Sequence, residues 1–173
     1  NKADKYEQTP LFGAAWKGHK EIISMLLKVK GIDVNKSDKY GETPLNRAAM
    51  ESYEEIVSML LKAEGIKVNK ADNYEQTPLN RAAMDGHKDI VSMLLKAEGI
   101  KVNQAYKDGR TPLWRAVWKG HQDIVSMLLN VKDIDVNQAD EDEQTPLWRA
   151  AESGHKEIVS MLLKVEGIDV NQA

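Results

Sequence analysis

The stretch DKYGETPLNRAAMESYEEIVSMLLKAEGIKVN, residues 38–69, decides the fold, because close copies of it fill the whole chain. Thr-Pro-Leu begins at residues 9, 43, 77, 111 and 145, and Ser-Met-Leu-Leu begins at residues 24, 58, 92, 126 and 160. A fixed period, here 34 residues, is the signature of a repeat architecture. We therefore expect one continuous array over residues 1–173, with repeats 1–34, 35–68, 69–102, 103–136 and 137–170 and a stub at 171–173.

Each repeat predicts two short helices and a turn. Thr is a favoured N-cap and Pro is favoured at the first helical position, so Thr43-Pro44 begins a helix of about eight residues. A second helix begins with acidic residues and is expected to stop at Gly65, where glycine would act as the C-cap; Asp133 takes this place in the fourth repeat. The segment Ile-x-Val-Asn and the polar residues after it predict an extended stretch and a hairpin-like turn.

A helix pair this short cannot bury its apolar side alone, so neighbouring pairs must stack. The sequence therefore predicts an all-α solenoid of stacked antiparallel helix pairs, joined by extended, hairpin-like turns. In the first helix of the fourth repeat, the expected core positions are Leu113, Ala116 and Val117.

The composition excludes several classes of function. The 173 residues carry a formal net charge of −3, which argues against a nucleic-acid partner. Cysteine is absent, which excludes disulfides and thiolate chemistry, and no apolar run reaches the roughly 20 residues that span a membrane. No signal peptide is visible and the chain begins at Asn1, so we expect a trimmed chain and a cytoplasmic location.

The histidines do not predict a metal site. One histidine occurs in each repeat except the second, where Tyr53 replaces it. Successive repeats lie roughly 8–10 Å apart, whereas zinc ligands must lie about 2 Å from one ion. No nucleophile–base pair or phosphate-binding loop stands out. We expect no catalysis, no metal ion and no other cofactor.

Residues 38–69 resemble an ankyrin repeat. The family pattern is D-x-x-G-x-T-P-L-x-x-A-A-x-x-G-H-x-x-I-V-x-x-L-L, followed by G-A-D-V-N, and the resemblance recurs in all five repeats. The usual period is 33, and the extra residue here lies just before the glycine of LLKVKGIDVN. A tetratricopeptide repeat shares the period of 34, but there the proline follows the second helix. The resemblance implies a non-enzymatic module that holds a protein partner on a concave face, formed by turn tips and first helices, and a structural role for Gly-His.

The chain departs from the family pattern in its turns and at its ends. The turn glycine is kept at Gly41 and Gly109 but is replaced by Glu7, Glu75 and Glu143. A left-handed backbone at each glutamate would cost on the order of 1 kcal/mol. Neither end is a polar capping repeat, so we expect end fraying or end-to-end self-association.

A third departure follows Thr-Pro-Leu, where the family commonly has His. Asn can keep a hydrogen bond at this position, whereas Phe and Trp cannot replace it in the same way. The residues found here are Phe12, Asn46, Asn80, Trp114 and Trp148.

Comparison of the five copies separates scaffold from surface. Twelve of the 34 positions are identical in all copies, and the variation gathers in the turn and on the exposed side of the first helix. Aromatic residues, Met and Arg are enriched at interface hot spots. We predict that a partner protein contacts Tyr6, Trp16, Tyr40, Met50, Tyr74, Met84, Tyr106, Arg110, Trp114, Arg115, Trp118, Trp148, Arg149 and Glu152.

Parts of this set have other interpretations. Trp114 and Trp148 would instead pack between repeats, in the space of the family's His. Arg115 and Arg149 lack an acid four residues later and are expected to be free for a partner's carboxylate, or to form part of a solvated face. The acidic turn at 140–143 favours a basic patch on the partner, or is simply solvated.

Two further functional interpretations stay open. The context of four asparagines resembles that of asparaginyl hydroxylation sites in cytosolic ankyrin repeats, although each side chain would otherwise bond the hairpin backbone. These are Asn35, Asn69, Asn103 and Asn137. The uniform Ser-Met-Leu-Leu indicates recent duplication or an engineered array built on one template, which would exist only as a recombinant protein. A scaffold without a partner is then the alternative, and the varied turns argue against it.

Overall fold

The computed structural model describes residues 2–172, and this part of the chain holds ten helices and no strand. The prediction of an all-α fold is therefore confirmed. The first helices of the repeats are α1 (Pro10–Trp16), α3 (Pro44–Met50), α5 (Pro78–Asp85), α7 (Pro112–Lys119) and α9 (Pro146–Glu152). The second helices are α2 (Lys20–Leu26), α4 (Glu54–Leu61), α6 (Lys88–Leu95), α8 (Gln122–Leu129) and α10 (Lys156–Leu162).

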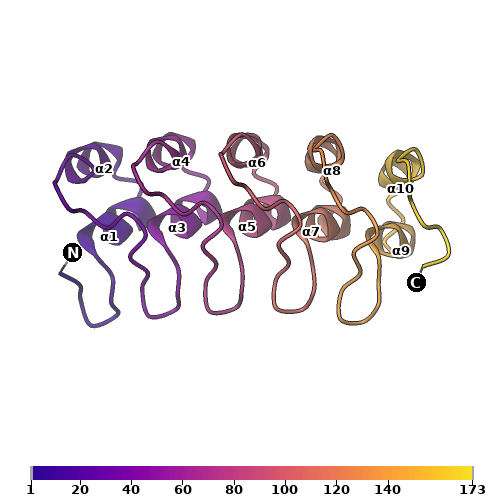
Figure 1. The fold of residues 1–173 in the computed structure, drawn as a ribbon, viewed down its shortest axis with the longest axis horizontal. Coiled ribbons are helices and arrows are strands. Elements are labelled where there is room, and N and C mark those ends of the chain that lie inside the picture. Colours follow the sequence, from indigo (N-terminus) through magenta and orange to yellow (C-terminus); the bar gives the residue numbers. More distant parts are fainter. Residues whose placement is uncertain (1, 173) are drawn as a thin grey trace.

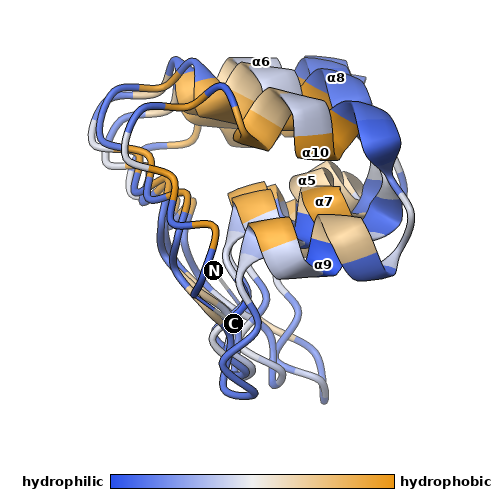
Figure 2. Ribbon diagram, turned by 90° about the vertical axis from the view of Figure 1, so that its right-hand side faces the viewer, coloured by the Kyte–Doolittle hydropathy of each residue, from blue (hydrophilic) through white to orange (hydrophobic). Residues whose placement is uncertain are grey.

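The helices form two layers that run along the molecule. Figure 1 shows the first helices in one row and the second helices in a row above it, with one pair following the next along the long axis. Each helix contacts its own partner and the equivalent helix of the neighbouring repeat. Seen from the end, the turns project away from the helix layers, beneath the first helices (Figure 2). This is the stacked-pair solenoid that the repeats predict.

Thr-Pro begins every first helix as predicted. The hydroxyl of Thr9 accepts a hydrogen bond from the backbone N–H of Phe12 at 3.2 Å, and Thr111 accepts one from Trp114 at 3.1 Å. The same cap occurs in the other three repeats, and proline follows the threonine each time. Because the cap satisfies an otherwise unpaired donor, it fixes where the helix starts.

The second helices end earlier than the sequence predicts. Helix α4 ends at Leu61, and a tighter turn follows, in which Ala63 N–H donates to the Leu60 carbonyl at 3.0 Å. Gly65 lies beyond this turn with a φ of +71°, so the prediction that it caps the helix is wrong. The intervening turn directs Ile66 back onto the core, where it packs against the buried residues.

The five turns share one left-handed backbone position. Gly41 and Gly109 have a φ of +80° there, and Glu7, Glu75 and Glu143 keep the same conformation with values of +62°, +66° and +63°. The condition for the predicted strain is therefore met at all three glutamates.

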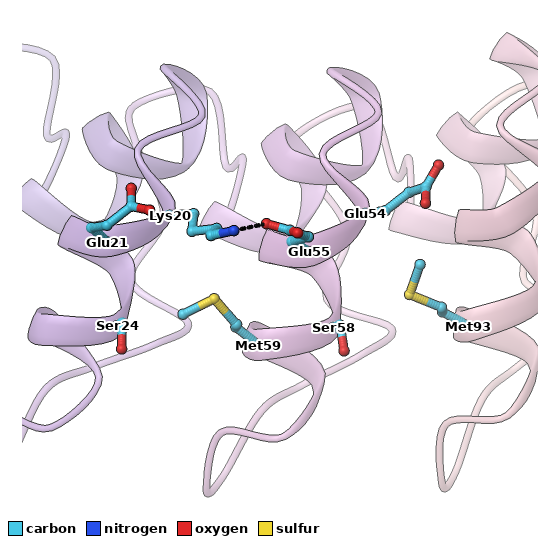
Figure 3. A pocket seen from close by; sticks show the side chains of 8 residues that line it. All are labelled: Lys20, Glu21, Ser24, Glu54, Glu55, Ser58, Met59 and Met93. Atoms are coloured by element: carbon cyan, nitrogen blue, oxygen red, sulfur yellow. Dashed lines mark ion pairs between the residues drawn. The ribbon is translucent and has the colours of Figure 1, made fainter.

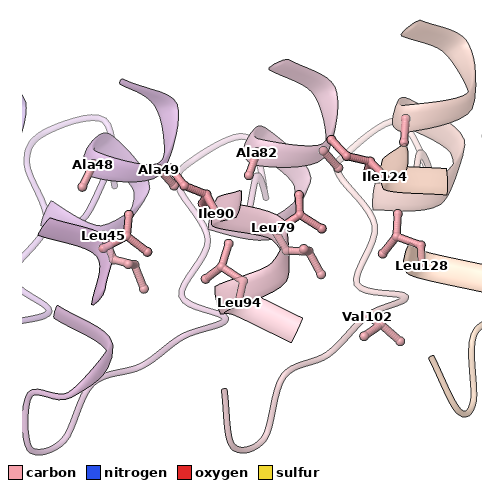
Figure 4. Packing of buried hydrophobic residues seen from close by; sticks show 14 of the residues in the cluster. Leu45, Ala48, Ala49, Leu79, Ala82, Ile90, Leu94, Val102, Ile124 and Leu128 are labelled. Carbon is pink, nitrogen blue, oxygen red and sulfur yellow. The ribbon is translucent and has the colours of Figure 1, made fainter. Parts of the chain in front are cut away.

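One apolar core runs between the two helix layers through all five repeats. Figure 4 shows Leu45 and Leu79 of the first helices packed with Ile90 and Leu94 of α6. The predicted stripe at Leu113, Ala116 and Val117 is fully buried. The apolar side of each helix is therefore fully buried only when side chains of an adjacent repeat pack on it.

Polar groups join the repeats at two levels. Each histidine ring after the first bonds a first-helix carbonyl of the preceding repeat, as between His87 Nε2 and Met50 O at 3.0 Å. The Asn35 amide donates to Gly65 O at 2.7 Å, and its oxygen accepts from Lys67 N–H at 2.8 Å. The same pair of bonds recurs at Asn69, Asn103 and Asn137. These asparagines therefore bond the hairpin backbone, and their hydroxylation stays a prediction.

Candidate protein-binding surface

Three tyrosines stand in a row on the first three turn tips. The tips are linked by backbone hydrogen bonds, from Lys39 N–H to Tyr6 O at 3.0 Å and from Asn73 N–H to Tyr40 O at 2.9 Å. The Lys39 ammonium lies 4.5 Å from the Tyr6 ring centre and 4.7 Å from that of Tyr40. All three rings, including Tyr74, are exposed. The ladder therefore holds the tyrosines at a fixed spacing of one repeat.

Two tryptophans extend this surface onto the first helices. Trp16 ends α1 and Trp118 lies near the end of α7, and both rings are exposed. The Trp118 ring contacts that of Trp114, with centroids 5.8 Å apart and planes tilted by 53°. The Arg110 guanidinium lies 4.4 Å from the Trp114 ring and 5.9 Å from the Trp118 ring. Such cation–π contacts restrict the ring before any partner arrives.

Trp114 takes the packing role rather than the contact role. Its side chain is 1% exposed, and its indole N–H donates to Gln144 O of the next repeat at 2.9 Å. Asn46 makes the equivalent bond to Gln76 O at 3.1 Å, so the indole replaces the amide as the donor. Trp148 holds the same position in the fifth repeat but is 36% exposed, because no further repeat covers it here.

The prediction that Arg115 and Arg149 are free for a partner's carboxylate is wrong. Arg115 is buried: it lies 3.6 Å from the Asp108 carboxylate, donates to the Met84 sulfur and stacks on the Tyr106 ring. Burial lowers the pKa of its guanidinium, and Asp108 opposes this shift. Arg149 donates to Glu152 at 2.7 Å, an acid three residues away rather than four. Asp108 belongs to the turn before α7, and Glu152 lies three residues after Arg149 on α9.

Arg47 and Arg81 hold the position of Arg115 in the second and third repeats, and they differ in their ion pairs. Arg47 pairs with Glu42 of its own turn and lies 3.6 Å from Glu51. Burial raises the pKa of Glu42, although the Arg47 charge and hydrogen bond act in the opposite direction. Arg81 forms no ion pair with Asp85 or with any other acid in residues 2–172.

The sequence matches the family model for ankyrin repeats in three copies, over residues 1–72, 64–140 and 101–173. The chain belongs to the ankyrin repeat family. Ankyrin repeats are generally protein–protein interaction modules, and the family is typically non-enzymatic. A search of curated proteins gives no match for this sequence.

Two absences in the described part of the ankyrin array bear on other functions. Within residues 2–172, no helix is long and apolar enough to cross a membrane. The same residues contain no group of three or more His, Asp or Glu side chains that could hold a metal ion.

The predicted contact set thus divides into an exposed and a supporting group. The exposed aromatic residues, which we call the aromatic row, are Tyr6, Trp16, Tyr40, Tyr74, Trp118 and Trp148. The supporting residues are half-buried or buried, or are paired with neighbours, and comprise Met50, Met84, Tyr106, Arg110, Trp114, Arg115, Arg149 and Glu152.

The acidic turn of the fifth repeat is only partly available to a partner. Asp140 is buried, accepts backbone N–H groups from Asp142 and Gln144, and receives the Arg110 side chain at 3.1 Å. Glu141, Asp142 and Glu143 are exposed. A basic patch on the partner stays a prediction that concerns these three acids.

A groove on the opposite side of the ankyrin array was not predicted. It lies between second helices, with the Lys20–Glu55 ion pair at 2.5 Å across it and Ser58, Met59 and Met93 beside it (Figure 3). The hydrogen bond that Lys20 donates to Glu55 is the main cause that raises the pKa of Lys20. The invariant Ser-Met positions lie outside the core stripe of Ile, Val and Leu, although the methionines of the second to fifth repeats pack against it.

Proposed function

We propose that this ankyrin array binds a partner protein on the concave side, through its turn tips and first helices. The observation that carries the proposal is the aromatic row, in which six large rings on the turns and first helices are exposed. Exposed aromatic residues that gather on one face mark interaction sites, whereas single exposed residues need no explanation.

Contacts that already hold the aromatic rings favour tight binding, because less side-chain entropy is then lost when a partner binds. Arg110 and Lys39 restrict rings that would otherwise rotate freely, and the backbone ladder fixes the turn tips. Ordering a free side chain on binding costs about 0.5–1.5 kcal/mol. A ring that is already held avoids much of that cost, and burying one tryptophan contributes roughly 2–4 kcal/mol.

The pattern of variation also supports binding over a scaffold without a partner. The positions that differ among the repeats include Trp16, Trp118 and the turn tips, which are exposed, whereas the invariant positions lie mostly in the core. A pure scaffold would gain nothing from such differences. Varied, exposed positions favour binding equally in an array that arose by duplication and in one engineered from a template.

The test compares two quadruple variants in affinity capture with quantitative mass spectrometry. The first replaces Trp16, Tyr40, Tyr74 and Trp118 of the aromatic row by alanine. The matched control replaces Met59, Met93, Met127 and Met161 by alanine, on the second helices of the opposite side. We expect a protein that the wild type and the control capture and that the first variant loses.

Affinity measurements on that protein then quantify the effect. Losing hot-spot side chains worth at least about 2 kcal/mol weakens binding by roughly thirtyfold or more. Circular dichroism must show that both variants keep the wild-type helix content at the temperature of the capture experiment, because the methionines are half-buried and their removal lowers stability. Equal capture by both variants, or loss with the methionine control alone, would overturn the proposal.

A further inference from the structure

The first repeat exposes apolar side chains that are buried or half-buried in every following repeat. Ile22 on α2 is 45% exposed, whereas Ile56, at the same position in the second repeat, is 2% exposed. Met25 is 70% exposed, and its internal counterparts are half-buried. The difference arises because, in an internal repeat, the preceding repeat covers this side. We call the side with Ile22 and Met25 the front face.

The fifth repeat exposes the opposite side of the same kind of interface. Val170 is 60% exposed, whereas its counterpart Val136 is 6% exposed. Leu163 and Trp148 are likewise exposed, although their counterparts in the fourth repeat are half-buried and buried. Within the described chain nothing covers these residues, which we call the back face.

The front and back faces are the two halves of an interface that the molecule already forms four times. At each internal junction, the back side of one repeat packs on the front side of the next, with helix against equivalent helix. We infer that a second copy of this chain stacks its front face on the back face of the first and continues the solenoid. The repeat-to-repeat packing inside one molecule would then recur between molecules.

Charges at the rim fit this arrangement. Across internal junctions, Lys20 pairs with Glu55 at 2.5 Å and Lys88 pairs with Asp123 at 2.8 Å. Lys156 of the back face and Glu21 of the front face hold the same positions, and neither forms an ion pair within residues 2–172. Stacking brings Lys156 of one copy against Glu21 of the next.

The two faces are different, so the association is head to tail and does not close after two copies. The sequence gives the fifth repeat a formal charge of −5 and the first repeat +2, which favours contact between unlike ends and opposes back-to-back pairing. Trp148 is the one residue that the back face shares with the aromatic row. The stacking of two copies does not require the partner protein of the aromatic row.

Sedimentation velocity over micromolar to millimolar protein tests the inference. We expect the wild type to form a concentration-dependent series of species. Ile22→Lys blocks the front face and Leu163→Lys blocks the back face, each in an exposed position, and each should weaken association by roughly tenfold or more. Asn130→Lys places the same charge on an exposed residue of the internal fourth repeat, where the other four repeats have Lys, and should associate like the wild type.

Mixing the two blocked variants identifies the geometry. A one-to-one mixture of Ile22→Lys and Leu163→Lys retains one intact front face and one intact back face, so it should form a heterodimer and nothing larger. The heterodimer also shows that both variants are folded. A wild type that stays monomeric throughout, a blocked variant that associates by itself as strongly as the wild type, or a mixture that associates no better than either variant alone would each overturn the inference.

Discussion

At the residue scale, one backbone conformation recurs in all five turns but is occupied by two kinds of residue. Glycine adopts a positive φ without steric cost, whereas glutamate brings its Cβ close to a carbonyl oxygen. The turns nevertheless keep the conformation at Glu75 and its equivalents. The Asp72 carboxylate accepts hydrogen bonds from the N–H groups of Tyr74 and Gln76, and the Tyr74 carbonyl accepts one from the next tip, so the loop is fixed. The fold therefore overrides the local preference of the residue.

Replacing Glu75 by glycine should stabilise the protein. Removing the Cβ at a φ of +66° relieves strain of about 1 kcal/mol, part of which is offset by the greater freedom of glycine in the unfolded chain. We expect a gain of up to about 1 kcal/mol in the free energy of unfolding, measured with urea.

The opposite substitution at Gly109 serves as its control. A Cβ there would lie 3.0 Å from Asp140 Cα and at a φ of +80°, so Gly109→Ala should destabilise by more than about 1 kcal/mol. A loss of stability in Glu75→Gly would contradict the strain argument.

Glu42 should make stability depend on acidic pH. Burial raises its pKa in the folded state, so between the unfolded and folded pKa values the folded protein binds more protons than the unfolded chain. Its contribution to stability is therefore fully present below about pH 4 and is lost as the pH rises through the folded pKa.

Glu42→Gln isolates this effect with the residue that three other repeats use at the same position. On going from neutral pH to about pH 4, the wild type gains stability from the protonation of Glu42, and the variant does not. Urea unfolding should therefore show the variant to be less stable, relative to the wild type, near pH 4 than at neutral pH. A difference between the two proteins that stays constant with pH would exclude the assigned role of Glu42.

At the element scale, the helices depend on their neighbours because each has only seven or eight residues. Isolated helices shorter than about 12 residues are marginal in water. Caps such as Thr111 fix where a helix starts, but packing against the next pair supplies most of the stability. The same side chain can therefore contribute very differently in an internal and in a terminal helix.

Trp114 and Trp148 provide a matched pair for this point. Trp114→Ala should cost about 3–5 kcal/mol, because it leaves a cavity between α7 and α9 and removes the bond to Gln144. Trp148→Ala should cost clearly less, since the ring is partly exposed. Urea unfolding of both variants at a concentration that keeps the protein monomeric measures the difference, and equal costs would contradict the assigned packing.

At the scale of the whole molecule, the array is nearly one-dimensional, because the main helix contacts within residues 2–172 join the two helices of one repeat or equivalent helices of adjacent repeats. Its stability is then approximately a sum of repeat terms and junction terms. The first and fifth repeats have one junction each, and the internal repeats have two. The ends should therefore open at lower free energy than the centre.

Hydrogen exchange with mass spectrometry tests this gradient. We expect amides of α1, α2, α9 and α10 to exchange faster than those of α5 and α6, by at least about tenfold for the loss of one junction worth more than 1.4 kcal/mol. The blocked variant Leu163→Lys should be used, so that self-association does not protect the ends. Uniform protection along the array would show that the repeats unfold as one unit.

The amino-acid sequence alone is enough to predict the repeat period, the starts of the first helices and the core positions. Thr-Pro caps act through neighbouring residues, and the apolar spacing fixes which side of each helix is buried, so both can be read locally. The pairing of Arg149 with Glu152 follows an i,i+3 spacing and could also be read locally. In contrast, only the tertiary structure shows how deeply Trp114 is buried and which acid holds Arg115. Those outcomes depend on residues some 30 positions away, such as Gln144 for Trp114, or on turn residues such as Asp108 that no helical spacing relates to their partners. The distinction between the exposed Trp148 and the buried Trp114 has the same cause, because identical residues differ only in whether another repeat packs on them.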